Sequence, residues 1–296
     1  MKATNRTSPL VFPIVGTSFC RLILNTARRF AYPFAPALSR GLDVSLSSIT
    51  SLIAINQVTS LLGALFGPLS DRLGYRKMMI AGMALLGTGM LAAAFFPLYA
   101  VVLVALFLSG LGKSIFDPAV QAWAGNRVPY RRRAMVIGIM ETSWSASTLI
   151  GIPLIAVLMD RYGWRSPFLV MGALGCVGSV ALFFIIPNEP SSDPPNLSAS
   201  EYVGAYSRLI SNKAALGALG YVFFVSAAND NLFVIYGAWL ENRFGLGLVA
   251  LGLGTSLIGA AELAGEGLTA TVSDRIGLKK AVVIGLSLSV LSYFAL

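Results

Sequence analysis

Long apolar runs, separated by short charged turns, follow one another along most of this chain. A helix needs roughly 20 mostly apolar residues to cross a bilayer. Inside a bilayer each backbone polar group must be bonded within the protein, so runs of this length favour helices. The 296 residues are 56% hydrophobic and 12% charged, whereas a soluble domain carries roughly 25% charged residues. The sequence therefore predicts an all-α integral membrane protein.

Eight apolar runs and the start of a ninth are predicted to be transmembrane helices. They lie near 15–38, 45–67, 78–96, 99–125, 134–159, 167–187, 215–239 and 248–270, with the last from 281. A segment rich in Pro, Ser and acidic residues follows the sixth run, and this composition is typical of a flexible linker. We therefore predict a six-helix bundle at 1–187, a cytoplasmic linker at 188–212 and an incomplete second bundle at 213–296.

The net charge is +9, and the basic residues that produce it are distributed unevenly between the two sides of the predicted spans. Alternate loops on one side of the predicted spans contain fourteen basic residues: Lys2, Arg6, Arg72, Arg76, Lys77, Arg127, Arg131, Arg132, Arg133, Arg208, Lys213, Arg275, Lys279 and Lys280. The other side has four: Arg40, Arg161, Arg165 and Arg243. Basic residues gather on the cytoplasmic side of membrane proteins. This predicts a cytoplasmic N-terminus in the cell membrane, and it accounts for the basic residues without a nucleic-acid partner.

Several kinds of chemistry have no support in the sequence. The chain has no histidine, and Cys20 and Cys176 both fall inside apolar runs, so no disulfide framework or metal spacing is present. No G-x-x-x-x-G-K-[ST] loop and no nucleophile–base set can be found. We therefore predict that the protein is not an enzyme and uses neither a metal nor a cofactor.

One charged turn occurs twice. Residues 67–77 read GPLSDRLGYRK and residues 270–280 read ATVSDRIGLKK, so that Asp274 follows Asp71 by 203 residues. Repeated halves joined by a linker are typical of transporters. With the same shift, a second half that corresponds to 1–187 would end near residue 390. The repeat therefore predicts the rest of a ninth span and three further helices beyond Leu296.

The turn at 67–77 resembles the loop between helices two and three of the major facilitator superfamily, G-x-L-x-D-R-x-G-r-[RK]-x. The matching residues are Gly67, Leu69, Asp71, Arg72, Gly74, Arg76 and Lys77, and the second copy keeps Asp274, Arg275, Gly277 and Lys280. The resemblance implies two six-helix bundles that rock around a central cavity. It also implies that Asp71 helps to hold the halves together on the cytoplasmic side in one state. Gly74 would supply the positive φ of a tight turn.

Ionisable residues also lie inside the predicted spans, where each usually costs more than ~2.5 kcal/mol at the centre of the bilayer. They are Arg21, Arg28, Arg29, Lys113, Asp117, Glu141, Asp230, Glu262 and Glu266. The third and sixth spans contain none. In the superfamily, these two helices lie outside the bundle that lines the cavity, so the resemblance places the charges where water or partner groups can reach them.

Helical spacing refines this set. Lys113 and Asp117 are four residues apart and can pair within one helix. Glu262 and Glu266 have the same spacing, so one of them is expected to hold a proton. We hypothesise that Arg28, Asp117 and Glu141 form a polar core in the first half, and that Asp230, Glu262 and Glu266 face it. The alternative is purely structural pairing between helices.

Two other motifs of the superfamily fit poorly. In LFLSGLG, residues 106–112, Leu106 and Ser109 replace the arginine and the glutamine of the fourth-helix motif, so proton coupling by that arginine is in doubt. In the fifth span Pro153 is displaced from the exporter motif, which leaves the direction of transport open. A proline there predicts a kink or a weakened helix.

Together these features predict a secondary transporter that moves a small solute by alternating access, with protons as the coupling ion. The alternative is a truncated membrane protein that does not transport, such as a relic or a sensor. A channel is a weaker third interpretation, because repeated halves favour stepwise transport.

Overall fold

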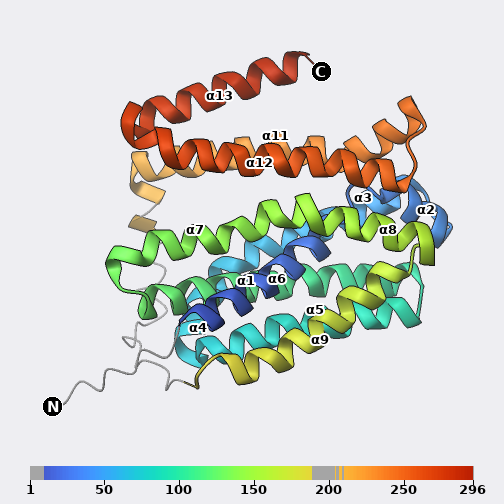
Figure 1. The fold of residues 1–296 in the computed structure, drawn as a ribbon, viewed down its shortest axis with the longest axis horizontal. Helices are drawn as coiled ribbons and strands as arrows, with labels where there is room; N and C mark the ends of the chain where they lie inside the picture. The colour runs from blue at the N-terminus through green and yellow to red at the C-terminus, as the bar shows by residue number, and fades with distance from the viewer. Residues whose placement is uncertain (1–9, 189–203, 205–206, 209, 296) are drawn as a thin grey trace.

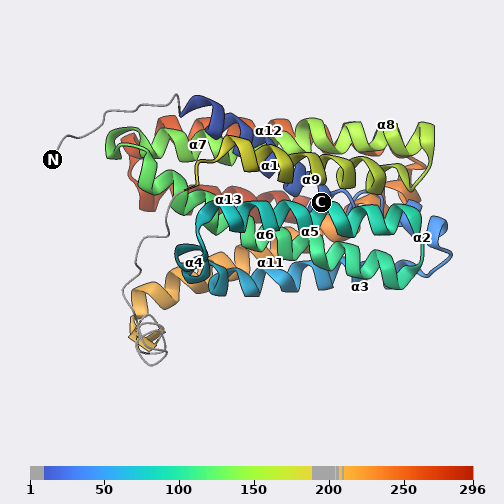
Figure 2. The same ribbon diagram turned by 90° about the horizontal axis from the view of Figure 1, so that it is seen from below.

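The computed structural model describes residues 10–188, 204, 207–208 and 210–295, and every secondary-structure element in these ranges is a helix. The longer helices lie side by side along the long axis of the molecule (Figures 1 and 2). In order they are α1 (Val11–Arg29), α2 (Ala35–Leu42), α3 (Leu46–Val58), η1 (Thr59–Leu62), α4 (Gly63–Leu73), α5 (Tyr75–Phe95), α6 (Tyr99–Arg127), α7 (Tyr130–Ala146), η2 (Ser147–Gly151), α8 (Ile152–Tyr162), α9 (Ser166–Ile185), α11 (Lys213–Phe244), α12 (Leu248–Ile276) and α13 (Leu278–Ala295).

The chain turns at two ends of this array. We call one the basic end, because the turns that follow α4, α6 and α12 lie there among basic residues such as Arg76 and Lys280. The other, which we call the opposite end, contains the turns that follow α2, α5, α8 and α11. In Figure 1 the basic end is on the left and the opposite end on the right.

Six described helices are long and apolar enough to cross a membrane, and a seventh span results if the bent pair Ala35–Leu42 and Leu46–Leu62 counts as one. This count is below the eight spans and part of a ninth predicted from the sequence. The helix α1 is not among the six, because its arginines Arg21, Arg28 and Arg29 lower its apolarity. It nevertheless packs against α6, α7 and α9.

Three of the predicted spans contain irregular turns. The predicted first span, 15–38, is not one helix, because the chain leaves α1 after Arg29 and forms turns at 30–34 before α2 begins. The second span continues through the 3-10 turn η1 into α4 and ends at Leu73. The fifth contains the π-helix η2, which ends two residues before Pro153. The irregularity expected at this proline is confirmed, and π-helical turns often mark functional sites.

The repeated charged turn has the same backbone conformation in both copies. Gly74, between α4 and α5, has φ +93°, and Gly277, between α12 and α13, has φ +91°. A side chain would strain the backbone in this region, and glycine avoids that strain. The positive φ expected for Gly74 is confirmed, and the second copy shares it.

Close packing through glycine joins α5 to α9. A Cβ atom on Gly175 would lie 2.7 Å from the Cα atom of Gly87, and one on Gly87 would lie 2.7 Å from the backbone nitrogen of Cys176. Helices in membranes associate largely through such close van der Waals contact. These two helices correspond to the predicted third and sixth spans, 78–96 and 167–187, and neither span contains a charged residue.

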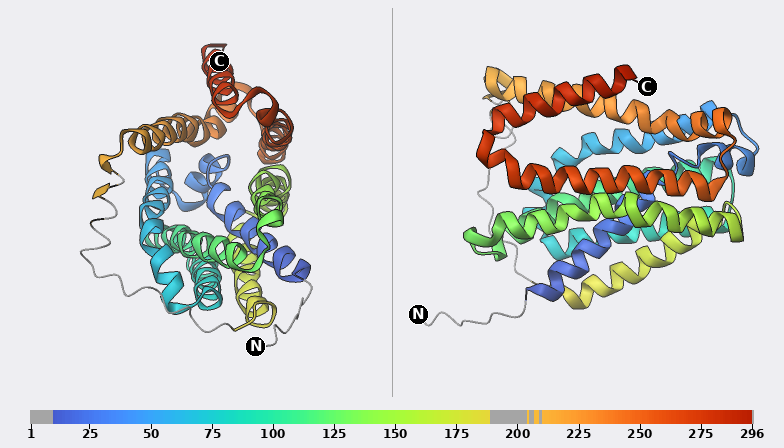
Figure 3. Two further views of the ribbon diagram at one scale, coloured as in Figure 1. Left: turned by 90° about the vertical axis from the view of Figure 1, so that its left-hand side faces the viewer. Right: turned by 45° about the horizontal axis from the view of Figure 1, so that its top comes forward.

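The helices α11 and α12 lie against one side of the first group, α1–α9. The helix α12 packs along α7, η2 and α8, whereas α11 contacts α2. Seen along the helix axes, α13 stands away from the first group (Figure 3). Near the opposite end, a Cβ atom on Gly237 of α11 would lie 2.7 Å from the Cα atom of Pro33. The buried residues of α11 are Phe233, Tyr236 and Gly237, so its half toward the basic end is exposed.

Candidate functional site

Arg21 lies at the centre of an ionic network in the first group of helices. Its Nε donates to Asp117 Oδ1 over 3.1 Å, and its Nη1 and Nη2 donate to the two carboxylate oxygens of Glu141 over 2.9 and 3.2 Å. The arginine side chain is 5% exposed, whereas that of Glu141 is 45% exposed. The two-pronged bond to Glu141 fixes both groups, because a guanidinium matches a carboxylate in shape as well as charge.

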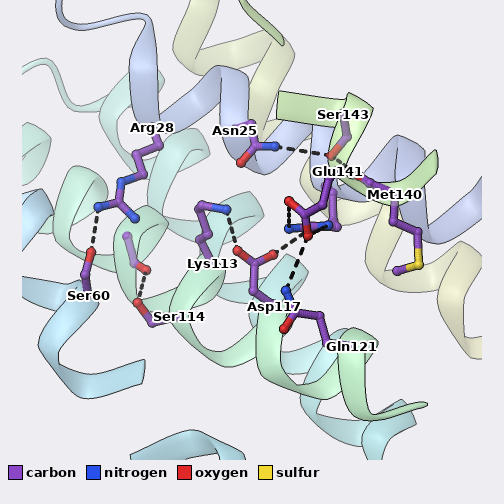
Figure 4. Close-up of polar contacts among 12 residues, drawn as sticks. Asn25, Arg28, Ser60, Lys113, Ser114, Asp117, Gln121, Met140, Glu141 and Ser143 are labelled. Atoms are coloured by element: carbon purple, nitrogen blue, oxygen red, sulfur yellow. Dashed lines mark hydrogen bonds and ion pairs between the residues drawn. The ribbon is translucent and has the colours of Figure 1, made fainter. Parts of the chain in front are cut away.

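The same network reaches α6 by two further contacts, drawn in Figure 4. Lys113, which is buried, donates to Asp117 across one helical turn, as its spacing predicts. Gln121 Nε2 donates to Glu141 Oε1 over 3.4 Å. Asp117 therefore accepts from two cations, and Glu141 accepts from one cation and one amide.

Arg28 lies about two helical turns from Arg21 and contacts different residues. Its Nη2 donates to Gln57 Oε1, and to Ser60 Oγ over 2.6 Å (Figure 4 shows the bond to Ser60). The structure thus pairs Asp117 and Glu141 with Arg21, and not with Arg28 as the sequence-based hypothesis grouped them.

Arg29 joins the two groups of helices. Its Nη1 donates to Thr148 Oγ1 over 2.6 Å, and its Nη2 donates to Glu262 Oε1 of α12 over 3.1 Å. The guanidinium carbon lies 4.3 Å from the ring centre of Trp144 and 5.0 Å from that of Phe233. Stacking on aromatic faces stabilises a desolvated cation. Thr148 belongs to the π-helix η2, and its hydroxyl also donates to Glu262 Oε2 over 3.1 Å.

The three acidic candidates on α11 and α12 all contact the first group, although their described partners are other residues than Arg28, Asp117 and Glu141, the polar core that the sequence-based hypothesis had them face. Asp230 Oδ2 accepts from Gln57 Nε2 over 3.1 Å, Glu262 pairs with Arg29, and Glu266 Oε1 accepts from Ser145 Oγ over 2.6 Å. Although Glu262 and Glu266 share one helix face, each has its own partner on the other group. Their contacts do not test the expectation that one of them holds a proton.

A further ion pair joins the groups at the opposite end. Arg40 Nη1 donates to Glu241 Oε1 over 2.5 Å, between α2 and α11, and the arginine side chain is 62% exposed. The polar contacts described between the two groups therefore run from the middle of the helices, at Asp230 and Glu266, to the opposite end.

The motif residues of the first copy lie around the turn between α4 and α5. Asp71 Oδ1 accepts from Tyr75 Oη over 2.8 Å, and Asn126 donates to the same hydroxyl over 2.9 Å. Arg76 donates to the carbonyl oxygen of Phe183 and stacks over its ring. Gly67 and Arg72 lie within α4, and Lys77 is exposed. Asp71 thus has a partner on the turn itself, and its role as a latch stays a prediction.

The second copy lies at the basic end between α12 and α13. Arg275, Gly277 and Lys280 are exposed, and Asp274 belongs to α12, although its side chain lies outside the described part of the chain.

The sequence-based hypothesis left Arg21, Arg29 and Gln57 outside its main candidates. In the structure these three residues bind the acidic candidates: Arg21 binds Asp117 and Glu141, Arg29 binds Glu262, and Gln57 binds Asp230. One signal existed, because Arg21 and Arg28 share a helix face with Asn25. Spacing along one helix does not show which partner lies opposite, so it could not distinguish the arginine that binds the carboxylates.

The family model described as the Major Facilitator Superfamily matches residues 17–296. The chain belongs to the Major Facilitator Superfamily. An uncharacterized MFS-type transporter of Bacillus subtilis, YceJ, is 27% identical over 233 residues, which cover 78% of this chain and 58% of that protein.

Two other relatives in the superfamily are named for different transported compounds. The 4-hydroxybenzoate transporter PcaK of Pseudomonas aeruginosa is 31% identical over 186 residues, covering 62% of this chain and 41% of that protein. A multi-drug resistance efflux pump PmrA homolog of Lactococcus lactis is 26% identical, covering 94% of this chain and 68% of that protein. The chain spans about half the length of several of these relatives.

A solved structure supports the fold. The crystal structure of a bacterial homolog of the human lysosomal transporter Spinster superposes with a TM-score of 0.77 at 14% identity, over 92% of this chain and 64% of that one. The chain is therefore an all-α, multi-pass membrane protein with the MFS fold.

Proposed function

We propose that this MFS protein moves a small solute across the cell membrane by alternating access, with protons as the coupling ion. The observation that supports this most strongly is the set of polar contacts that join the two helix groups in the middle of the spans, above all Arg29 with Glu262. Ionisable groups inside a membrane are costly, so those that occur are usually paired with one another or mark a transport pathway. These charged residues lie where a solute bound between the two helix groups would contact both groups.

The proposed proton sites are Glu141 and Asp117. Glu141 is partly exposed and shares Arg21 with Asp117, so a proton that binds to Glu141 removes one of the two charges that hold the guanidinium. Arg21 then keeps its ion pair with Asp117 alone, and Lys113 also contacts Asp117. Protonation would thereby loosen α7 from α1, and α12 packs along α7 and η2 as well as along α8.

The proposed orientation places the basic end in the cytoplasm. The excess of Lys and Arg in the turns at that end supports it. In this orientation the described contacts between the groups lie toward the outside, and the exposed half of α11 faces the cytoplasm. The repeated turns with Gly74 and Gly277 then both lie at the cytoplasmic surface.

The test is transport in proteoliposomes with and without a pH gradient. Purified full-length chain would be assayed with a panel of radiolabelled carboxylates, amines and sugars. We expect the gradient to drive accumulation of at least one class, and Glu141→Gln or Asp117→Asn to abolish this while the protein remains inserted. Equal flux of the unmodified protein with and without the gradient, or gradient-driven accumulation that persists in both variants, would contradict proton coupling through these residues. The absence of flux for every class would contradict transport.

A further inference from the structure

The four basic side chains inside the helices do not have equivalent partners. Arg21, Arg29 and Lys113 each form an ion pair with a carboxylate, at Asp117, Glu141 or Glu262. Among the described residues, Arg28 forms none within 4.0 Å. Its two hydrogen-bond partners, Gln57 and Ser60, are both neutral.

Arg28 also keeps unused hydrogen-bonding capacity. A guanidinium has five N–H donors in a fixed planar fork. Both described bonds of Arg28 leave from Nη2, and within the described ranges Nε and Nη1 make none. The residue is only partly buried, and it lies close to the C-terminal end of α1, where the chain breaks into the turns at 30–34. Donors of a planar cation are thus open in the middle of a membrane protein.

Gln57 connects this cation to the second helix group. Its Oε1 accepts from Arg28, while its Nε2 donates to Asp230 Oδ2 on α11 over 3.1 Å and to Tyr32 Oη over 2.5 Å. The amide oxygen therefore occupies, on Arg28, the place that a carboxylate oxygen would take. Through the same amide group, Arg28 is linked to a residue of the other helix group.

We propose that Arg28 binds the carboxylate group of the transported solute, and that Gln57 holds this place when the solute is absent. The inference rests on the proposed transport function and gives its substrate class. A carboxylate matches the fork of a guanidinium, and a hydrogen bond from this cation to a charged acceptor is stronger than one to a neutral amide oxygen. We infer a single negative charge, because Lys113 and Arg29 are already paired with Asp117 and Glu262.

Solute binding would also act on the contact between the groups. A carboxylate on Arg28 displaces Gln57 Oε1, and the amide then loses the contact that orients Nε2 toward Asp230. The link between α3 and α11 weakens at the moment the solute is bound. Arg28 thus serves as the binding residue, and Gln57 as a positioning residue that couples binding to the helix groups.

A binding measurement tests this without requiring transport. The purified chain in detergent would be titrated by calorimetry with benzoate, with its uncharged analogue benzamide and with the cation benzamidine. We expect benzoate to bind at least tenfold more tightly than either analogue. Arg28→Gln should weaken benzoate binding at least tenfold, and Arg28→Lys should weaken it less. The matched control is Arg161→Gln, an exposed arginine on α8 that should leave binding unchanged. Preference for benzamidine, no benzoate binding, or equal binding by Arg28→Gln would overturn the proposal.

A second measurement uses the unmodified sequence, in case the variants fold poorly. Phenylglyoxal reacts with accessible arginines, and peptide mass spectrometry would report its reaction at Arg28. We expect benzoate, but not benzamide, to protect Arg28 while labelling of Arg161 stays constant. An Arg28 that does not react, or that reacts equally with and without benzoate, would contradict the site. Benzoate binding without solute flux would contradict the proposed transport function alone, and flux without Arg28-dependent binding would contradict only this inference.

Discussion

At the scale of single residues, burial decides what each arginine contributes. Arg21 and Arg40 both pair with carboxylates, but the side chain of Arg21 is 5% exposed and that of Arg40 is 62% exposed. Exposed ion pairs contribute little because water screens them. Removing one partner of a buried pair leaves an uncompensated charge, which costs far more.

We therefore expect Arg21→Gln to lower the free energy of unfolding by roughly 3–5 kcal/mol, because it leaves Glu141 without its cation and Asp117 with Lys113 alone. Arg40→Gln should cost about 1 kcal/mol or less. Unfolding of the purified chain in mixed micelles, followed by circular dichroism, measures both. Similar losses for the two variants would show that the network around Arg21 is not buried in the way the structure describes.

The sequence predicted the candidate charged residues, but only one of the pairs that they form. Apolar context was sufficient to select Asp117, Glu141, Asp230, Glu262 and Glu266, because a carboxylate inside a span stands out from its surroundings. It could not predict the pairs, since these join residues up to 233 positions apart, as in Arg29 with Glu262. Helical spacing predicted one contact correctly, that of Lys113 with Asp117, because both lie on the same helix.

At the scale of elements, hydropathy located the helices but not their irregular turns. The predicted ends of the third and sixth spans lie within a few residues of α5 and α9, since long apolar runs end where charge or proline begins. The turns at 30–34, the 3-10 turn η1 and the π-helix η2 lie inside runs that hydropathy predicts as continuous spans. One contact in η2, from Thr148 to Glu262 of α12, joins residues 114 positions apart, which hydropathy does not detect. Only the proline at 153 gave a local signal of one of these irregular turns.

Glycine contacts give a prediction for one helix pair. Gly175→Ala places a Cβ atom against the backbone of Gly87, so α5 and α9 must separate, which typically costs 1–3 kcal/mol. Gly138→Ala on α7 meets no atom within 4 Å, and alanine there should be neutral or stabilise by up to about 1 kcal/mol, because it favours the helix. Thermal unfolding of both variants measures the difference. A stabilising Gly175→Ala would contradict the close approach of these helices.

At the scale of the whole molecule, two helix groups meet in the middle and at one end. The repeated turn predicted a chain with two related parts, and Gly74 and Gly277 share an unusual conformation. The sequence could not predict which end of the groups is joined, because an MFS fold permits both arrangements. In this structure the Arg40–Glu241 pair and the approach of Gly237 to Pro33 join the opposite end, while α11 is exposed toward the basic end.

Alternating access requires that contact at the opposite end and contact at the basic end exclude each other. The direct test is the distance between spin labels at Tyr130→Cys on α7 and Gly217→Cys on α11, two exposed positions near the basic end, with Cys20 and Cys176 replaced. Pulsed electron paramagnetic resonance would compare this protein with one that also carries Arg40→Glu, which places like charges at the opposite end.

We predict that the distance distribution gains a shorter population when Arg40→Glu separates the opposite end. One unchanged distance distribution in both proteins, with the fold intact by circular dichroism, would contradict the account that the two helix groups move against each other.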